Sequence, residues 1–506
     1  KIRPTIILSN IMMMTMNYRA LLILSLSSAL SSEANNHVNG FQNSLSPLNT
    51  HIRGGGLGMG WATRKIRPSV AAKSSLTDSA AAETDAAIEG TTDGLSWESF
   101  EDKFASDEVR APVLTLYRDT NGWCPFCERV WVCIRAKNLP YQERLIQLFN
   151  KPEWYKEMVP TTQVPAVLFH EWGGGDSSQN CRKLVWESTD IMLALDEAFP
   201  DTIQLVHDTP EYRSAEEEIE ELSKAGFAFL AAARQQTSGE NGEDSKKLDP
   251  EEEQEQKLAD FLSALDKLDQ SLEATGGPFR LGSEFSGIDA LMVPVLERWR
   301  YQLPLKSETP IDILEGRPFI KKWFEGMEAF APYSERVMGD HYSWVATNVM
   351  FTKYFGGKDD EIARSSAAAI ELINSFKPNG DMKCEERFAL EAAKKIVGNH
   401  EGVVKDCTSQ DPKSQLFIPR SKEEDNANAV LHFVVQLLLD GDSAITNAAS
   451  KPLPDVLQNM DQEQKEDAAL AAKTVASRLC VPRDMSAPAA KILRAVLMIV
   501  SSRLSD

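Results

Sequence analysis

The chain has 506 residues, more than an ordinary domain holds, so its length predicts roughly two to four units. Hydrophobic residues make up 42% and charged residues 25%, which is usual for a globular protein, and the formal net charge is −21. This charge argues against a nucleic-acid partner, because phosphate binding needs clustered Lys and Arg. Seven cysteines without disulfide-framework spacing fit a reducing compartment better than a secreted fold.

The first 77 residues have the composition of a targeting region. They carry eight Lys or Arg and a single acid. Met16 precedes a mostly apolar run from Ala20 to Leu30, which is typical of a signal peptide and too short to cross a bilayer. A basic stretch rich in Ser, Asn and Gly follows and is similar to a transit peptide. We expect residues 1–77 to direct the protein to a plastid, the alternatives being a cytoplasmic or other organellar location.

Short β-prone runs and two helices come next, in the order strand, helix, strand, hairpin, helix. This order is that of an α/β thioredoxin-like domain. Apolar, β-branched runs indicate buried strands, and apolar residues at helical spacing indicate helices. The strands are expected at Val113–Tyr117, Tyr141–Leu148, Val164–Phe169 and Lys183–Glu187, and the helices at Glu128–Lys137 and Thr189–Ala198.

The sequence Trp-Cys-Pro-Phe-Cys at residues 123–127 separates the first strand from the first helix. Cys124 would lie at the N-terminus of that helix, where unpaired N–H groups and the helix dipole stabilise a nucleophilic thiolate. Cys127, one turn further on, is a candidate resolving thiol. Zinc binding, buried structural thiols and redox chemistry all remain open for a lone C-x-x-C motif, although Cys133 and Cys181 do not supply a second zinc-ligand pair.

Two downstream pairs of residues suit the binding of a peptide. Pro165 opens a strand, and such a proline beside a thiol site is typically cis, which would turn the backbone of Val164 outward to pair with a peptide as an added strand. The alternative is an ordinary edge-strand proline. Glu187 and Ser188 end a strand and begin a helix. Amide groups there suit a carboxylate, and the Glu side chain suits an ammonium group, although a simple helix cap has the same pattern.

A helical half follows. Ser286 and Asp289 form an S-x-x-D cap before an apolar helix that Pro294 should kink, and we expect Asp289 to matter for stability more than for substrate choice, at roughly 1 kcal/mol for a lost cap. The polar, acidic segment Thr237–Lys257 is predicted to be a solvated loop. The helices are expected at Glu211–Ala233, Leu258–Ala274 and Ala290–Trp299.

Together these motifs resemble the cysteine-type glutathione transferases of the lambda and omega classes, with dehydroascorbate reductases nearby. The run Cys-Pro-Phe-Cys-Glu-Arg-Val-Trp from residue 124 resembles the lambda run Cys-Pro-Phe-Ala-Gln-Arg-Val-Trp. Further matches are Asn-Lys-Pro-Glu-Trp-Tyr at 150–155, Gly-Pro-Phe-Arg-Leu-Gly at 277–282 and Phe-Ser-Gly-Ile-Asp-Ala at 285–290. The resemblance covers residues 110–345 and departs from the family pattern at Cys127, where these classes usually carry Ala.

The resemblance implies a glutathione-dependent thiol transferase with Cys124 as catalytic thiol and no metal. It would reduce glutathione mixed disulfides of proteins or small molecules, or dehydroascorbate, while conjugation to electrophiles is less favoured. Two alternatives remain: a non-catalytic carrier that retains the glutathione site, and a redox sensor built on the two cysteines. The residues implied to hold glutathione are Phe126, Lys151, Val164, Pro165, Glu187 and Ser188.

The C-terminal extension carries no recognised motif. Gly and Pro residues punctuate about five helical segments, which predicts a small all-α bundle. The role of the extension stays open, and docking or dimerisation is only a guess. The oligomeric state of the protein also stays open. The predicted helices are near Ile362–Phe376, Glu385–Val397, Asn426–Leu439, Asp461–Leu479 and Ala487–Leu504. The expected organisation is a targeting region at 1–77, a linker at 78–108, a thioredoxin-like domain at 109–203, an all-α transferase domain at 204–345 and an all-α extension at 346–506.

Overall fold

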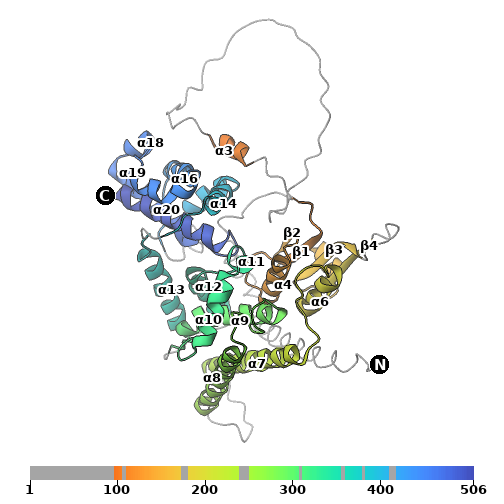
Figure 1. Cartoon of the computed structure of the whole chain (residues 1–506). Helices are drawn as coiled ribbons and strands as arrows, with labels where there is room; N and C mark the ends of the chain where they lie inside the picture. The colour runs from red at the N-terminus through yellow and green to blue at the C-terminus, as the bar shows by residue number, and fades with distance from the viewer. Residues whose placement is uncertain are drawn as a thin grey trace, which may run out of the picture.

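A four-stranded sheet with its helices, a helical half and a C-terminal helical bundle make up the computed structural model (Figure 1). The predicted targeting region lies outside the described residues. The described ranges are 96–104, 110–172, 181–238, 250–306, 310–354, 359–378, 382–409 and 418–505.

The sheet has the strand order β2-β1-β3-β4, with β1 parallel to β2 and antiparallel to β3, and β3 antiparallel to β4. Alternate side chains of β1 point to opposite faces, so Leu114 and Leu116 pack with α4 and α6 while Tyr117 packs near α5. This arrangement confirms the thioredoxin-like domain. The elements are β1 (Leu114–Asp119), α4 (Pro125–Ala136), β2 (Tyr141–Ile146), α5 (Glu153–Met158), β3 (Ala166–Trp172), β4 (Cys181–Trp186) and α6 (Ser188–Ala198).

The helical half follows α6 in the chain. Buried Phe261, Leu265 and Leu268 form an apolar stripe on α8 at helical spacing. The expected solvated loop is wrong for residues 250–257, which form the first turns of α8; the acids in its first turn favour a helix N-terminus. The helices are α7 (Pro210–Ser238), α8 (Pro250–Thr275), α9 (Gly287–Lys306), α10 (Pro318–Ala329), α11 (Ala331–Ser334) and α12 (His341–Tyr354).

Asp289, in the first turn of α9, is fully buried and does more than cap a helix. One carboxylate oxygen accepts hydrogen bonds from the backbone N–H and the hydroxyl of Ser286, at 2.9 and 3.0 Å. The other accepts from the backbone N–H of Arg280 at 2.8 Å and from the indole N–H of Trp323 at 2.9 Å. Asp289 therefore joins α9, α10 and the turn before α9.

The extension is an all-α bundle with one continuous apolar core. All five predicted helices are present, together with shorter ones that the sequence did not reveal. Alanines at helical spacing on α19, such as Ala468, Ala472 and Ala476, are fully buried and let α20 approach closely. The elements are α13 (Asp359–Asn374), α14 (Glu386–Val397), α15 (His400–Cys407), α16 (Glu424–Leu438), η1 (Gly441–Ser443), α17 (Ala444–Ser450), α18 (Asp455–Gln458), α19 (Gln462–Arg478) and α20 (Ala487–Ser505).

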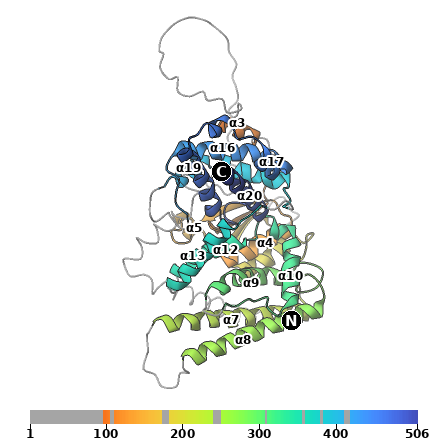
Figure 2. The same ribbon diagram turned by 90° about the vertical axis from the view of Figure 1, so that its left-hand side faces the viewer.

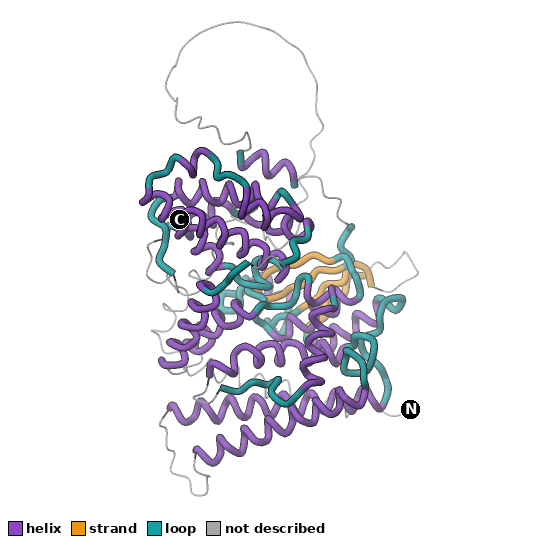
Figure 3. Tube along the Cα trace, turned by 60° about the vertical axis from the view of Figure 1, so that its left-hand side comes forward, coloured by secondary structure: helices purple, strands orange, loops and turns teal. Residues whose placement is uncertain are grey.

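A helix within the expected linker belongs to the same bundle. In α3 (Trp97–Lys103), Phe100 is fully buried in the extension core, and the Trp97 ring stacks on His400 at 4.4 Å between centroids. Figure 2 shows α3 beside the extension, at the end of the molecule away from α7 and α8. The strands lie between these two ends (Figure 3). None of the described helices combines the length and the apolar character needed to cross a bilayer.

Candidate functional site

Cys124 occupies the N-cap position of α4, as the sequence predicted. Its backbone is extended, with φ −73° and ψ 115°. Pro125 begins the helix, where the first N–H groups have no acceptor within the helix, so a residue without an N–H loses no hydrogen bond. The thiol is half-buried, whereas the side chain of Cys127 is only 1% exposed. The two cysteines therefore differ in access: a substrate can meet Cys124 before it meets Cys127.

The Cys127 thiol holds its proton tightly. Burial raises its pKa well above the ordinary value, and the hydrogen bond and charge of Cys124 and the charge of Asp119 raise it further. Cys127 is therefore a thiol rather than a thiolate at neutral pH. It can attack a disulfide only if a neighbouring group takes its proton.

Asp119 is a site residue that the sequence analysis missed. It ends β1, is fully buried, and one of its carboxylate oxygens accepts the backbone N–H of Trp123 at 2.7 Å. Its other oxygen has no hydrogen-bond partner among the described residues. Ligand atoms of Asp119, Cys124 and Cys127 lie within 4.8 Å of one another. These are three donor groups, whereas a structural zinc site takes four. An acid directly after a buried strand and before the cysteine motif was the available signal.

The loop before β3 lies against the sulfur of Cys124. The Val164–Pro165 peptide bond is cis, which confirms that expectation, and the Cys124 Sγ lies 3.9 Å from the carbonyl oxygen of Val164. The hydroxyl of Tyr155 donates to the carbonyl oxygen of Gln163 at 2.7 Å and so fixes the loop from α5. The backbone beside Cys124 is thus presented by a β-strand end, as an added-strand mode of peptide binding requires.

Glu187 and Ser188 lie where β4 meets α6. Glu187 is the N-cap of α6 with φ +71°, an uncommon conformation for a residue with a side chain, and Ser188 is buried in the first turn. Lys151 is half-buried; burial lowers its pKa, and the charges of Cys124 and Cys127 oppose that change.

Phe126 follows Pro125 on the first turn of α4. Its side chain is half-buried, and the guanidinium carbon of Arg129 lies 5.1 Å from the centre of its ring. Cys124 thus lies beside Val164 and Cys127, and Lys151 precedes α5. Phe126, Glu187 and Ser188 occupy the element ends that the sequence assigned to them.

Arg298 of α9 anchors the loop before α4, residues 120–124, from the helical half. Its guanidinium group donates to the Glu128 carboxylate at 2.6 Å and to the carbonyl oxygen of Trp123 at 2.9 Å. It also lies over the Trp344 ring, 4.4 Å from the centroid. No local pattern could have revealed this residue, because its partners lie far away along the chain.

Three tryptophans of the transferase module pack in buried apolar clusters. Trp123 and Trp344 share a small buried cluster with Met350, and Trp299 packs against the ring of Phe261. Their side chains are between 1% and 8% exposed. Their burial makes them packing residues rather than part of the candidate site.

Comparison with known proteins places two parts of the chain in one family. The profile of the glutathione S-transferase N-terminal domain matches residues 123–198, and that of the C-terminal domain matches residues 251–326. The extension at 346–506 lies outside both matches.

Curated relatives from Arabidopsis thaliana agree. Glutathione S-transferase DHAR3, chloroplastic, is 27% identical over 206 residues, covering 41% of this chain and 66% of that protein. Glutathione S-transferase L2, chloroplastic, is 30% identical over 215 residues, covering 42% and 62%. The chain thus spans slightly less than two thirds of either protein. Glutathione S-transferase L3 is 30% identical over 222 residues, covering 43% of this chain and 80% of the relative. The chain belongs to the glutathione S-transferase family.

Proposed function

We propose that the protein is a glutathione-dependent thiol transferase in which Cys124 is the nucleophile. The observation that carries this proposal is the position of Cys124: a half-buried thiol at the N-cap of α4, facing the Val164 carbonyl of a cis-proline loop. Unpaired N–H groups of the first helical turn favour negative charge on such a sulfur. A thiolate there can attack a disulfide held along the loop.

The reaction starts with a glutathione mixed disulfide of a protein or small molecule. The Cys124 thiolate attacks the glutathione sulfur, the original S–S bond breaks, and the acceptor leaves as a thiolate that takes a proton from water. Glutathione remains on Cys124 as a new disulfide. The thiolate of a second glutathione then attacks that glutathionyl sulfur, which gives glutathione disulfide and restores Cys124. Dehydroascorbate reduction would use the same thiol, with two glutathione molecules supplying the electrons.

Glutathione would be held by backbone and charge. The N–H and C=O of Val164, before Pro165, can pair with its peptide backbone. The N-terminus of α6 at Ser188, with Glu187, suits the carboxylate and ammonium of the γ-glutamyl group. Lys151 suits a second carboxylate, and Phe126 would contact bound glutathione from the first turn of α4.

Cys127 offers a second route out of the glutathionylated state. Its Sγ would attack the Sγ of Cys124, expel glutathione as a thiolate, and leave a Cys124–Cys127 disulfide. The proton on Cys127 must first go to a base, and Asp119 is the buried carboxylate beside it. Because the pKa of Cys127 is raised, we expect the glutathione route to dominate at neutral pH.

Single-cysteine variants test the proposal. With a glutathionylated peptide and free glutathione, native protein should release the peptide thiol, and Cys124→Ser should lower the rate by about a hundredfold or more, as loss of a nucleophile does. Cys127→Ser should keep at least about half of the native rate. Binding of glutathione without turnover by the native protein would contradict the enzyme and favour the carrier. A Cys127→Ser variant as inactive as Cys124→Ser would show that two thiols are required.

A plastid location fits this function. The N-terminal composition predicts a targeting region, and two of the relatives carry the word chloroplastic in their names. A fusion of residues 1–77 to a fluorescent protein should enter plastids, and a diffuse cytoplasmic signal would contradict the assignment.

A further inference from the structure

The loop between α19 and α20, residues 479–486, lies directly against residues 120–124, the loop before α4 that carries the proposed nucleophile and is called the catalytic loop below. Gly122, two residues before Cys124, has φ +70°, and a Cβ placed on it would lie 2.9 Å from Cγ and 3.4 Å from Cδ of Pro482. The proline ring therefore covers the backbone of Gly122 with no room for a side chain between them. A residue of the extension thus contacts the segment that carries the reactive thiol.

Arg336 fastens this loop to the thioredoxin-like half. Its guanidinium group donates to the carbonyl oxygen of Pro482 at 2.6 Å. The same group lies 4.5 Å from the ring centroid of Trp131 on α4 and 3.8 Å from the Glu143 carboxylate on β2. One side chain therefore joins the extension loop, the catalytic helix and the sheet.

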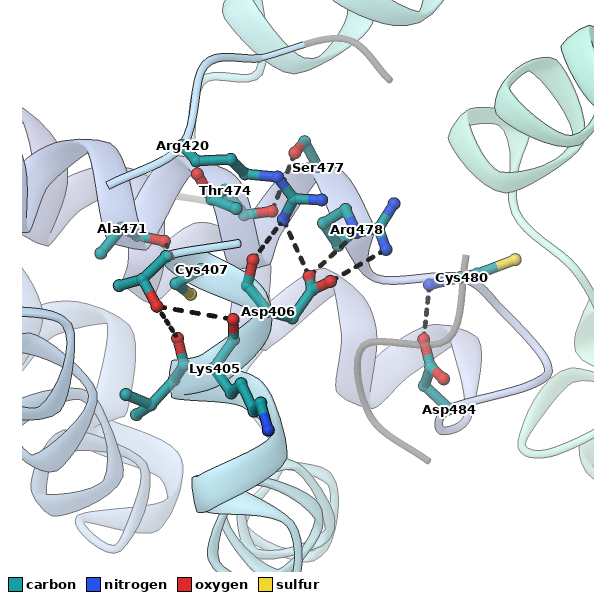
Figure 4. A network of polar contacts seen from close by, with 12 residues as sticks. Lys405, Asp406, Cys407, Arg420, Ala471, Thr474, Ser477, Arg478, Cys480 and Asp484 are labelled. Carbon is teal, nitrogen blue, oxygen red and sulfur yellow. Dashed lines mark hydrogen bonds and ion pairs between the residues drawn. The ribbon is translucent and has the colours of Figure 1, made fainter. Parts of the chain in front are cut away.

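Buried ion pairs hold the loop from the extension side (Figure 4). Asp406 on α15 binds Arg478 at the end of α19 at 3.0 Å, and it also binds Arg420 at 2.9 Å. Arg483 donates to the Arg478 carbonyl oxygen at 3.1 Å and to Asp484 at 2.7 Å. Buried charges are costly unless they are paired, so the Asp406 pairs fix the end of α19 and the Arg483 contacts fix the loop that follows it.

Within the loop, Asp484 closes a turn on Cys480. The backbone N–H of Cys480 donates to the Asp484 carboxylate at 2.8 Å, a contact drawn in Figure 4. The next residue is bonded to α12: the backbone N–H of Val481 donates to Ser343 Oγ at 2.9 Å. The loop is therefore fixed at both sides of Pro482.

We propose that the extension is a positioning element of the thiol site, in which the loop 479–486 holds the segment from Gly122 to Cys124 at the N-terminus of α4. This inference rests on Cys124 being the reactive thiol of the proposed function. Thiol chemistry needs the sulfur placed to within a fraction of an ångström relative to the helix N–H groups and the bound disulfide. Asp119 and Arg298 hold the catalytic loop from two sides, and Pro482 holds it from a third.

Alkylation of Cys124 in the full-length protein tests the proposal without requiring turnover. Tryptic peptide 119–129 reports its modification by iodoacetamide across a pH series. Arg336→Met removes the bond to Pro482 but leaves Glu143 paired with Arg118. We expect alkylation near neutral pH to slow by about threefold, and the KM for glutathione to rise more than kcat falls, because thiolate stabilisation and binding geometry are both loosened.

Two further variants separate positioning from general stability. Arg336→Lys retains a donor for the Pro482 carbonyl oxygen and should restore most of the native rate. Leu457→Ala opens a cavity in α18, which Figure 1 shows at the far side of the extension, and should leave Cys124 alkylation unchanged. If Arg336→Met does not fold, Ser343→Ala, which removes the acceptor of the Val481 N–H, takes its place.

The outcomes are distinct. Native alkylation kinetics in Arg336→Met, or in Ser343→Ala when that variant stands in for it, would overturn the positioning role. The positioning role would also be overturned if Leu457→Ala slowed alkylation as much as Arg336→Met, or its substitute Ser343→Ala, does, since the effect would then be general destabilisation. Failure of iodoacetamide to modify Cys124 in the native protein would instead remove the proposed function on which this inference rests.

Discussion

At the scale of single residues, buried polar groups determine how the helical half of the transferase module packs. Asp289 has no exposed surface and accepts four hydrogen bonds, including one from Trp323 on α10. Burial raises its pKa although these bonds oppose that rise, so the carboxylate depends on its donors. An S-x-x-D pattern indicated only a cap, because the sequence does not show which distant groups reach the same carboxylate.

Replacement of Asp289 by Ala should therefore cost more than the roughly 1 kcal/mol of a lost cap. Four donors lose their acceptor in a buried place, so the free energy of unfolding should fall by about 3 kcal/mol. Chemical denaturation measures this loss, and Asp289→Asn, which keeps an acceptor, should lose less. A loss of unfolding free energy no greater than that of an exposed cap would contradict the structural role of the four hydrogen bonds. A change of substrate preference in Asp289→Ala would contradict it as well.

Local motifs predicted the residues around Cys124, while contacts between distant segments had to come from the structure. Cys124 at a helix N-cap and the cis bond before Pro165 follow from short runs of sequence, and both are present. Arg298 and Arg336 could not be predicted, because arginines of this kind are common and only the fold brings them beside Trp123 and Pro482.

At the scale of elements, α9 is joined to the turn before α12 by Glu297. Its carboxylate accepts from the hydroxyl of Tyr333 on α11 at 2.7 Å and from the backbone N–H of Gly339 at 2.9 Å. Burial, and then the charge of Glu128, raises the pKa of Glu297 to about 8 from an ordinary 4.5. The folded protein therefore keeps a proton on this group in a range where the unfolded chain has lost it.

This difference makes stability depend on pH. The stabilisation from proton binding by Glu297 is fully present below about 4.5 and is lost as pH rises through about 8. Glu297→Gln resembles the protonated group at every pH, so its free energy of unfolding should fall less between those values than that of the native protein. Urea denaturation of both proteins across the range measures the difference, and parallel curves would contradict the raised pKa.

The helical spacing of apolar residues and apolar runs predicted the long elements, whereas the short helices were not predicted. The five expected helices of the extension are present because each has an apolar stripe several turns long. Helices α5, α15 and α18 have only one or two turns, too few for a period to show. The first turns of α8 were assigned to a loop because their acids suggested solvation, although acids also favour a helix start.

At the scale of the whole molecule, α12 belongs to two cores at once. Tyr342 and Val345 lie in the apolar core of the extension, whereas Trp344 packs with Trp123 of the loop before α4. The hydroxyl of Tyr342 donates to the carbonyl oxygen of Ser477, and Asp340 forms an ion pair with Arg494 of α20. An extension attached in this way differs from a domain on a flexible linker.

The transferase module and the extension should consequently unfold as one cooperative unit. Cys133, in the core of the thioredoxin-like half, and Cys407, in that of the extension, are both about 1% exposed or less, and burial raises the pKa of Cys407 to about 12. Neither thiol should react with a maleimide until its own core opens. Pulse labelling at increasing urea, resolved by peptide mass spectrometry, should give coincident transitions for the two cysteines, because opening either core disrupts α12. Labelling of Cys407 at clearly lower urea than Cys133 would mean that the extension opens alone, and Arg494→Met, which breaks the pair with Asp340, should produce such a separation.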